Sequence, residues 1–181
     1  VIVQTGTLLR PQHLALLAAA GISEVTVHSR LRVALLTTGS ELAEPGQPLG
    51  RYQTYNSNGV MLETMLKSMN CSVEAVSMQD NADIIAQKIS ELLTRNDMLI
   101  LTGGAGNGKF DISQTQLNAM GSMHPWSINM RPGRPMRFGQ IQGKPVFVLP
   151  GNPVAAFVTF LEFVRGALLQ MQGLKKDLWL K

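Results

Sequence analysis

The sequence predicts an α/β fold of three layers, in which a mainly parallel sheet carries helices on both faces. From Arg32 onward, apolar strands alternate with amphipathic helices. Strands that are joined by helices pair in parallel through right-handed crossovers. The 181 residues, of which 45% are hydrophobic and 15% charged, are enough to bury a core and too apolar for a disordered chain.

The predicted elements follow one another in a regular order. Before Arg32, Pro11 near a first turn and Gly21 after a last turn predict a helix over 11–20. A short strand is expected over 24–27. Beyond Arg32, strands are expected at 33–37, 72–77, 98–101 and up to Leu149, and helices at 58–69, 82–93, 111–120 and from Pro153.

The net charge of +4 is a local feature of the chain. It results from 16 Lys and Arg against 12 Asp and Glu, but the stretch 112–161 contains no acidic residue and four basic ones. The rest of the chain therefore sums to zero. A local excess of this kind indicates an anion site, and we expect no general affinity for nucleic acid.

Cysteine usage and apolar runs exclude several classes of protein. Cys71 is the only cysteine in the sequence, so an intrachain disulfide, a cysteine-based zinc site and a CxxC redox site cannot form. The longest apolar stretch is interrupted at 150–153 by two prolines and a glycine, so no membrane span is expected there. A signal-peptide pattern is absent, and a cytoplasmic location is expected.

The loop after the third strand is rich in glycine. Ligands of parallel sheets bind outside the carboxyl ends of the strands, and backbone N–H groups of such a loop can hold a phosphate. The loop is nearly a P-loop, but Phe110 stands where Ser or Thr would hold magnesium, which disfavours an NTPase. Alternatively, the glycines only form a tight turn and Asp111 caps the next helix. The glycines are Gly103, Gly104, Gly106 and Gly108.

Two further segments present groups that suit anions. In Pro150-Gly151-Asn152-Pro153, Asn152 is placed to cap a helix whose first N–H groups would face a ligand, although a cap alone is an equal interpretation. In the segment 131–135, prolines and a glycine stiffen a loop that carries Arg131 and Arg134. Arginine binds oxyanions in bidentate geometry, and the alternative is a solvated basic turn.

Carboxylates are predicted at the ends of three strands. These are Glu41, Asp80 and Asp111, and the first follows Thr38, Gly39 and Ser40. Because the carboxyl ends of parallel strands meet at one edge of the sheet, the three acids could converge as oxygen ligands for Mg²⁺ beside phosphates. Each acid taken singly is more often a helix cap.

Together these motifs resemble the molybdopterin molybdenumtransferases, the MoeA family that includes the C-terminal part of gephyrin. The resemblance covers nearly the whole chain. The segments that carry it are Thr38-Gly39-Ser40-Glu41-Leu42, Glu44-Pro45-Gly46, Tyr55-Asn56-Ser57-Asn58, Thr102-Gly103-Gly104 with Asp111, Arg131-Pro132-Gly133-Arg134-Pro135, and Leu149-Pro150-Gly151-Asn152-Pro153-Val154.

The resemblance implies a fold, a domain order and an activity. It implies a MogA-like molybdopterin-binding domain over 32–175, preceded by the end of a linking domain at 1–31 and followed at 176–181 by a link to a C-terminal domain. The family inserts molybdate into adenylylated molybdopterin in a Mg²⁺-dependent step that releases AMP. Homodimers are usual, and a molybdopterin adenylyltransferase is an expected partner.

The resemblance also implies roles for individual residues. Glu41 and Asp111 match acids important for activity, and with Asp80 they are the expected metal ligands. The residues expected to contact the pterin, its phosphate or the nucleotide are Thr38, Gly39, Ser40, Gly103, Gly104, Gly106, Gly108, Arg131, Arg134, Pro150, Gly151, Asn152 and Pro153.

Some positions depart from the family pattern. Acidic residues are usual where Asn56, Gln79 and Lys109 stand, a serine is usual at Gly106, and a lysine at Ser127. Fewer acids weaken metal binding, so a diverged module that binds the ligand without turnover stays open. Adenylylation of molybdopterin on the same fold also stays open because of the glycine-rich loop.

Overall fold

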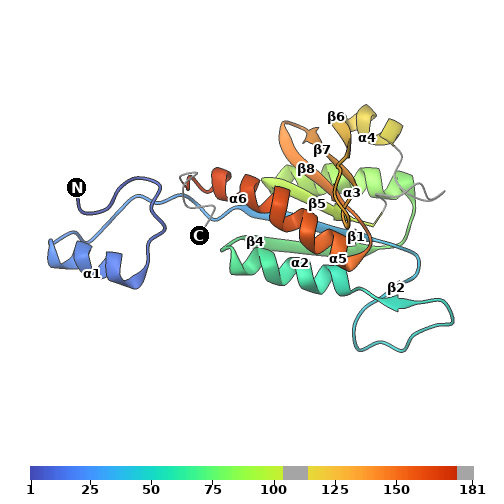
Figure 1. Ribbon diagram of the computed structural model, residues 1–181, viewed down its shortest axis with the longest axis horizontal. Helices are drawn as coiled ribbons and strands as arrows, with labels where there is room; N and C mark the ends of the chain where they lie inside the picture. Colours follow the sequence, from blue (N-terminus) through green and yellow to red (C-terminus); the bar gives the residue numbers. More distant parts are fainter. Residues whose placement is uncertain (104–113, 175–181) are drawn as a thin grey trace.

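The structure is a computed structural model that describes residues 1–103 and 114–174. Its centre is a sheet of six strands, in the order β4-β1-β5-β8-β7-β6 (Figure 1). Four strands pair in parallel: β4 (Ser72–Met78), β1 (Arg32–Thr38), β5 (Met98–Thr102) and β8 (Lys144–Leu149). An antiparallel hairpin extends the sheet beside β8: β7 (Pro135–Ile141) and β6 (Gly121–Ser127). The sheet is mainly parallel, as predicted.

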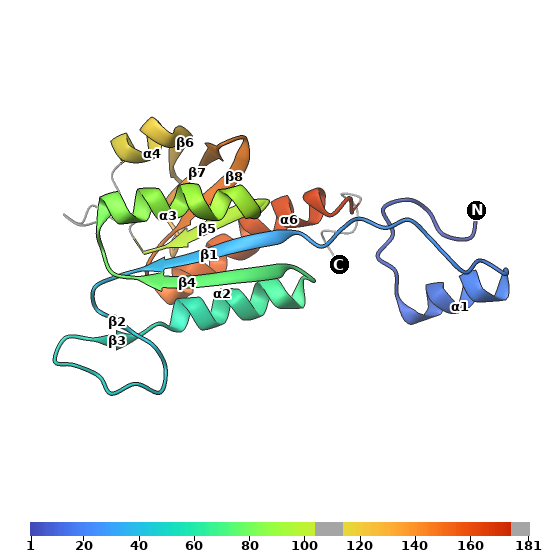
Figure 2. The ribbon, with the colours of Figure 1, turned by 180° about the vertical axis from the view of Figure 1, so that it is seen from behind.

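Helices cover both faces of this sheet (Figure 2). One face carries α3 (Ala82–Arg95) and α4 (Gln114–Met120). The other face carries α2 (Ser57–Ser68) and a continuous helical run made of α5 (Pro153–Thr159), the π-helical turn η1 (Phe160–Val164) and α6 (Arg165–Met171). The predicted three-layer α/β fold is therefore confirmed.

The central strands explain why the core is continuous. In β1, Val33 and Leu35 pack on the side of α2, whereas Ala34 and Leu36 pack on the side of α3. Side chains alternate between the faces of a strand, so a strand covered on both sides must be apolar throughout. This is why β1 and β5 read as unbroken apolar runs in the sequence.

The N-terminal segment lies away from the sheet. Helix α1 (Pro11–Ala19) confirms the predicted helix, and an extended segment leads from it to β1 (Figures 1 and 2). The predicted strand over 24–27 is wrong, since these residues are exposed and pair with no described strand. A strand needs a neighbour to accept and donate its backbone hydrogen bonds, and the alternating valines alone do not supply one.

Two features of the fold were not expected from the sequence. The hairpin of β6 and β7 is one, and the other is a short parallel pair, β2 (Leu42–Ala43) with β3 (Thr54–Tyr55), which follows the carboxyl end of β1. The helical run Pro153–Met171 is long and apolar enough to cross a membrane by length and composition. Phe160, Val164 and Leu168 in it are fully buried against the sheet, as in the core helix of a globular domain.

Candidate functional site

A cavity of about 150 Å³ lies at the carboxyl ends of β1 and β5. We call it the carboxyl-edge cavity. The neighbouring strands β1 and β5 are followed by helices on opposite faces of the sheet, α2 after β1 and α4 after β5. Open α/β sheets bind their ligands at such a switch point. Residues that line the cavity include Thr38, Glu41, Asn58, Thr102, Gly103 and Gly151.

Three loops meet around this cavity because of their glycines. Gly103 has a φ of +87°, and a Cβ at this position would overlap the carbonyl oxygen of Thr38. Only glycine combines this conformation with such a close approach. A Cβ at Gly151 would lie 3.8 Å from the Cα of Gly103. Gly103 after β5 therefore lies close to both Thr38 at the end of β1 and Gly151 after β8.

Asn58 connects two of these loops with the first turn of α2. Its Nδ2 donates to Oγ1 of Thr102 at 3.0 Å and to the carbonyl oxygen of Gly151 at 2.8 Å. The hydroxyl of Thr102 donates in turn to the carbonyl oxygen of Pro150 at 3.2 Å. The Oδ1 atom of Asn58 is buried and has no hydrogen-bond partner in the part of the chain that the structure describes.

Asn56 is the N-cap of α2 and is buried, with 4% of its surface exposed. Its Oδ1 accepts from the backbone N–H of Gly59 at 2.9 Å, whereas Nδ2 donates to Oγ1 of Thr37 at 2.9 Å and to Oε1 of Glu44 at 3.3 Å. An amide serves here better than a carboxylate because it can donate to the neighbouring carboxylate of Glu44. The asparagine that replaces the family's usual acid thus has a structural reason.

The predicted acidic ligands occupy different environments. Glu41 lines the cavity, and its carbonyl oxygen accepts from the backbone N–H of Thr54 at 2.8 Å, which fixes the backbone of the loop. Asp80 ties the loops after β1 and β4 together, since its Oδ2 accepts from the N–H of Ser40 at 3.0 Å. Asp111 lies outside the described residues. Within residues 1–103 and 114–174, no group of three or more His, Cys, Asp or Glu is placed to hold a metal ion.

The loop that follows β8 forms the helix cap that its sequence predicts. Asn152 is the N-cap of α5, and its Oδ1 accepts from the N–H of Ala155 at 3.1 Å, while Pro153 occupies the first helical position. Gly151 and Pro153 line the cavity. The predicted cap is confirmed, and the contact of this loop with a ligand stays a prediction. The remaining predicted ligand residues Gly104, Gly106 and Gly108 lie outside the described residues.

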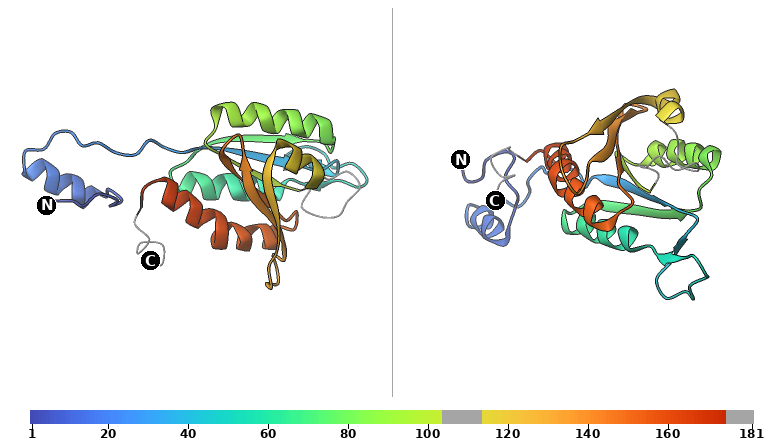
Figure 3. Two further views of the ribbon diagram at one scale, coloured as in Figure 1. Left: turned by 90° about the horizontal axis from the view of Figure 1, so that it is seen from above. Right: turned by 45° about the vertical axis from the view of Figure 1, so that its right-hand side comes forward.

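The loop with Arg131 and Arg134 joins β6 to β7 at the same edge of the sheet. Arg137 pairs with Val148, so β7 begins beside the carboxyl end of β8. Gly133 lies against α5, where a Cβ would be 2.9 Å from Cγ2 of Thr159. Figure 3 shows this turn projecting past α5, away from α3. Both arginines are exposed and lie outside the lining of the carboxyl-edge cavity.

Four residues of the site were missed as site residues. Thr37, Asn56, Asn58 and Thr102 form part of the polar wall of the cavity, although the sequence predicted no ligand contact for them. One local signal was available, because Asn56 and Gly59 have the spacing of a helix N-cap. The bonds of Asn58 had no such signal, since its partners are 44 and 93 residues away.

The opposite edge of the sheet is held by ion pairs. Arg32 and Asp97 are joined at 2.8 Å between the starts of β1 and β5. Arg95 donates from Nε to Glu74 at 2.9 Å, and Asn96 donates to the same carboxylate at 2.7 Å. These hydrogen bonds, that from Arg95 first, lower the pKa of Glu74 to about 2. We call this the amino edge.

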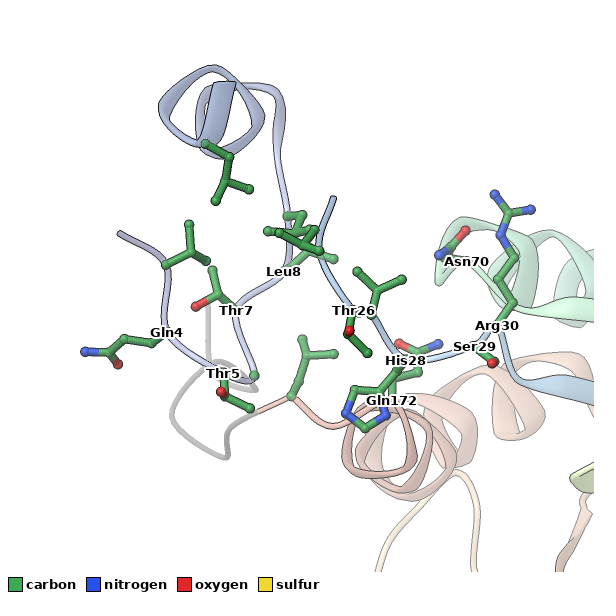
Figure 4. A pocket seen from close by; sticks show the side chains of 17 residues that line it. Gln4, Thr5, Thr7, Leu8, Thr26, His28, Ser29, Arg30, Asn70 and Gln172 are labelled. Carbon is green, nitrogen blue, oxygen red and sulfur yellow. The ribbon is translucent and has the colours of Figure 1, made fainter. Parts of the chain in front are cut away.

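A larger cavity of about 870 Å³ lies between the N-terminal segment and the end of α6 (Figure 4). Thr26, His28 and Gln172 are among its lining residues, and the ring of His28 lies against Gly173. It contains none of the residues that the sequence predicted for a site and lies away from the carboxyl ends of the strands. The smaller cavity is therefore the better candidate.

Comparison with known proteins identifies the family of the chain. Residues 34–170 match the family model MoCF_biosynth, a probable molybdopterin binding domain. The chain is 34% identical over 177 residues to the molybdopterin molybdenumtransferase of Haemophilus influenzae, covering 97% of this chain and 44% of that protein. It is also 34% identical to molybdopterin molybdenumtransferase 2 of Mycobacterium tuberculosis, with 96% and 44% covered.

Solved structures give the same result. The molybdopterin biosynthesis MoeA protein of Pyrococcus horikoshii superimposes with a TM-score of 0.84 at 30% identity, covering 95% of this chain and 43% of that one. The MoaB enzyme of Thermus thermophilus, at 18% identity and a TM-score of 0.60, shares the fold. The chain spans less than half the length of the curated relatives it matches. Since the family model covers most of its length, the chain belongs to the MoCF_biosynth family of molybdopterin-binding domains.

Proposed function

We propose that this chain is the molybdopterin-binding part of a molybdopterin molybdenumtransferase in molybdenum cofactor biosynthesis. In the proposed reaction, molybdate is inserted into adenylylated molybdopterin and AMP is released. The observation that carries the proposal is the carboxyl-edge cavity, which lies at the switch point of the sheet and is built by three packed loops. The names of the relatives support it.

The described residues suit the anionic parts of this substrate. The helical run Pro153–Met171 begins beside the cavity, where its first N–H groups and dipole favour a phosphate. The hydroxyls of Thr38 and Ser40 lie at the end of β1 and in the turn that follows it. Arg131 and Arg134 lie at the same edge and supply positive charge for phosphate or molybdate. In this proposal they approach the ligand from outside the cavity.

Magnesium fits this site when the substrate supplies part of the coordination. Mg²⁺ usually takes one or two carboxylates together with phosphates and water, so a cage of three protein acids is not required. Glu41 in the cavity wall and Asp111 are the carboxylates proposed to hold it, while Asp80 holds the β1 loop through Ser40. When bound, the ion neutralises phosphate charge as the adenylyl group leaves.

One assay separates this proposal from its alternatives. The chain is incubated with adenylylated molybdopterin, molybdate and Mg²⁺, and AMP is measured. We expect release of AMP that depends on molybdate and falls at least tenfold in Asp111→Asn. Product formed only from molybdopterin and ATP would indicate an adenylyltransferase instead. Tight binding without release of AMP would indicate a non-catalytic binding module.

The expected assembly and location are part of the same proposal. We propose a cytoplasmic homodimer that receives its substrate from a molybdopterin adenylyltransferase and binds neither nucleic acid nor membranes. Sedimentation velocity measures the oligomeric state, and a monomer at micromolar concentration would contradict the dimer. Co-sedimentation with the adenylyltransferase tests the partner, and labelled DNA and lipid vesicles test the two expected absences.

A further inference from the structure

The carboxamide of Asn58 is the one polar side-chain group of the described residues whose buried oxygen lacks a partner. An unsatisfied buried acceptor destabilises the folded state, and native structures nearly always provide a partner for it. Asn58 lines the carboxyl-edge cavity and is fixed at the first turn of α2. The missing partner is therefore expected to come from whatever the cavity binds.

The hydrogen-bond network determines which end of this amide is the oxygen. The carbonyl oxygen of Gly151 can only accept, so the atom 2.8 Å from it must be Nδ2. The hydroxyl of Thr102 already donates to Pro150 and therefore accepts from the same Nδ2. Rotating the amide would break both bonds. Both N–H groups are thus used within the protein, and Oδ1 is available only as an acceptor.

An acceptor of this kind selects the chemistry of its ligand. Phosphate and molybdate oxygens are themselves acceptors at neutral pH, so they have nothing to donate to Oδ1. The cavity, at about 150 Å³, has the volume of about five water molecules at about 30 Å³ each, which is room for one part of a ligand. Planar amino heterocycles carry N–H donors at their edge and have this size.

We propose that Oδ1 of Asn58 accepts a hydrogen bond from the exocyclic amino group of a heterocycle in the substrate, and so makes Asn58 a specificity-determining residue. This inference rests on the proposed function and names the group of the substrate that the cavity recognises. In adenylylated molybdopterin, two heterocycles carry such donors, the pterin and the adenine. The arms of the experiment distinguish them.

The test uses two pairs of compounds in which an oxygen replaces the exocyclic amino group and the adjacent ring nitrogen gains a proton. Lumazine carries an oxygen in place of the 2-amino group of pterin, and IMP carries an oxygen in place of the 6-amino group of AMP. Dissociation constants for the intact chain are measured by pterin fluorescence and by calorimetry. We expect about tenfold tighter binding of the amino compound in one pair, and that pair identifies the heterocycle.

Substitution of Asn58 completes the test. Asn58→Leu has a similar volume and no acceptor, so it should lose the preference for the amino compound over the oxo compound. Asn81→Ala is the matched control, because Asn81 caps α3 on the other face through Ile84 and does not line the cavity. The control should keep the preference.

Each outcome decides something specific. If the unchanged chain binds neither pair, the proposed function and this inference both fail. If it binds them with equal affinity, or if folded Asn58→Leu keeps the preference, only the inference fails, and Oδ1 is then satisfied by water. Loss of Mg²⁺ binding in Asn58→Leu would overturn it in favour of a metal ligand. Should Asn58→Leu not fold, Asn58→Ala replaces it in every arm.

Discussion

The two edges of the central sheet are built on opposite principles. At the amino edge, Arg32 pairs with Asp97, and Glu74 accepts from both Arg95 and Asn96, so the charged groups are matched. At the carboxyl edge, hydroxyls, amides and glycines enclose a cavity beside Glu41 and Asp80, and the buried oxygen of Asn58 has no partner among the described residues. The described polar groups of the amino edge are satisfied within the protein, whereas the carboxyl edge has a buried acceptor that a ligand can satisfy.

This difference indicates where stability and function are located. Residues in a completed network contribute to the free energy of folding, whereas unsatisfied groups and strained backbone are typical of binding sites. Substitutions at the amino edge should therefore change stability and spare binding. Substitutions at the carboxyl edge should weaken ligand binding, and some of them should also lower stability. The following predictions test this division, beginning with the largest expected effect.

Gly103→Ala should be the most damaging single change at the carboxyl edge. A Cβ would overlap the Thr38 carbonyl oxygen at a φ of +87°, and we expect a loss of about 2–4 kcal/mol in the free energy of unfolding together with loss of ligand binding. Urea denaturation measures the stability. Gly143→Ala is the matched control, since Gly143 has a φ of +72° but open space around it and should cost about 1 kcal/mol. Equal losses would show that the close approach of the loops is unimportant.

Asn56→Asp should cause the next largest loss in the free energy of unfolding. The carboxylate could no longer donate to Thr37 and Glu44, and it would face the charge of Glu44, so we expect a loss of about 1–3 kcal/mol at pH 7. Adding Glu44→Gln should restore part of the lost stability, because the amide of glutamine can donate a hydrogen bond to the aspartate at position 56. A double-mutant cycle by thermal unfolding measures this coupling. Additive losses would contradict the role given to Glu44.

Asn152→Ala should have a moderate effect that is shared between stability and binding. It removes the cap of α5, which costs about 1 kcal/mol of stability. Because this helix terminus borders the cavity, AMP should also bind more weakly, as calorimetry can measure. Weakened stability with unchanged binding would restrict Asn152 to a capping role, which the sequence alone left open.

Glu74→Gln should lower stability slightly and leave binding unchanged. The pKa of Glu74 is lowered to about 2, mainly by hydrogen bonds from Arg95, so the ionised form favours the folded state. Its contribution is complete above the ordinary pKa of about 4.5 and is lost as the pH falls towards 2. The stability difference between the two proteins should therefore shrink between pH 4.5 and 2. A difference that stays constant over this range would contradict the role given to this carboxylate.

The fold was largely predictable because the central strands are buried on both faces. Their continuous apolar runs, with amphipathic helices between them, identify the parallel part of the sheet. The hairpin of β6 and β7 escaped prediction because Pro125 and Gly139 interrupt any strand pattern. The short strand expected over 24–27 failed for the opposite reason, since a local pattern exists there without a pairing neighbour.

The site was predictable in its loops and not in its polar wall. Glycines and caps are local signals, so the segments after β1, β5 and β8 could be located from the sequence. The hydrogen bonds of Asn58 join residues far apart in the chain and become visible only when the sheet brings the ends of its strands together. The carboxylates at these ends gave a metal prediction, whereas Asp80 bonds to the neighbouring loop.

The most direct test of the account is to map where adenylylated molybdopterin binds. Two-dimensional ¹H–¹⁵N NMR of the labelled chain reports each backbone amide with and without the ligand. We expect the largest shifts to cluster at 37–41, 56–59, 102–103 and 151–152, around the carboxyl-edge cavity. Shifts that cluster instead around Thr26, His28 and Gln172 in the larger cavity, or along the amino edge, would contradict it.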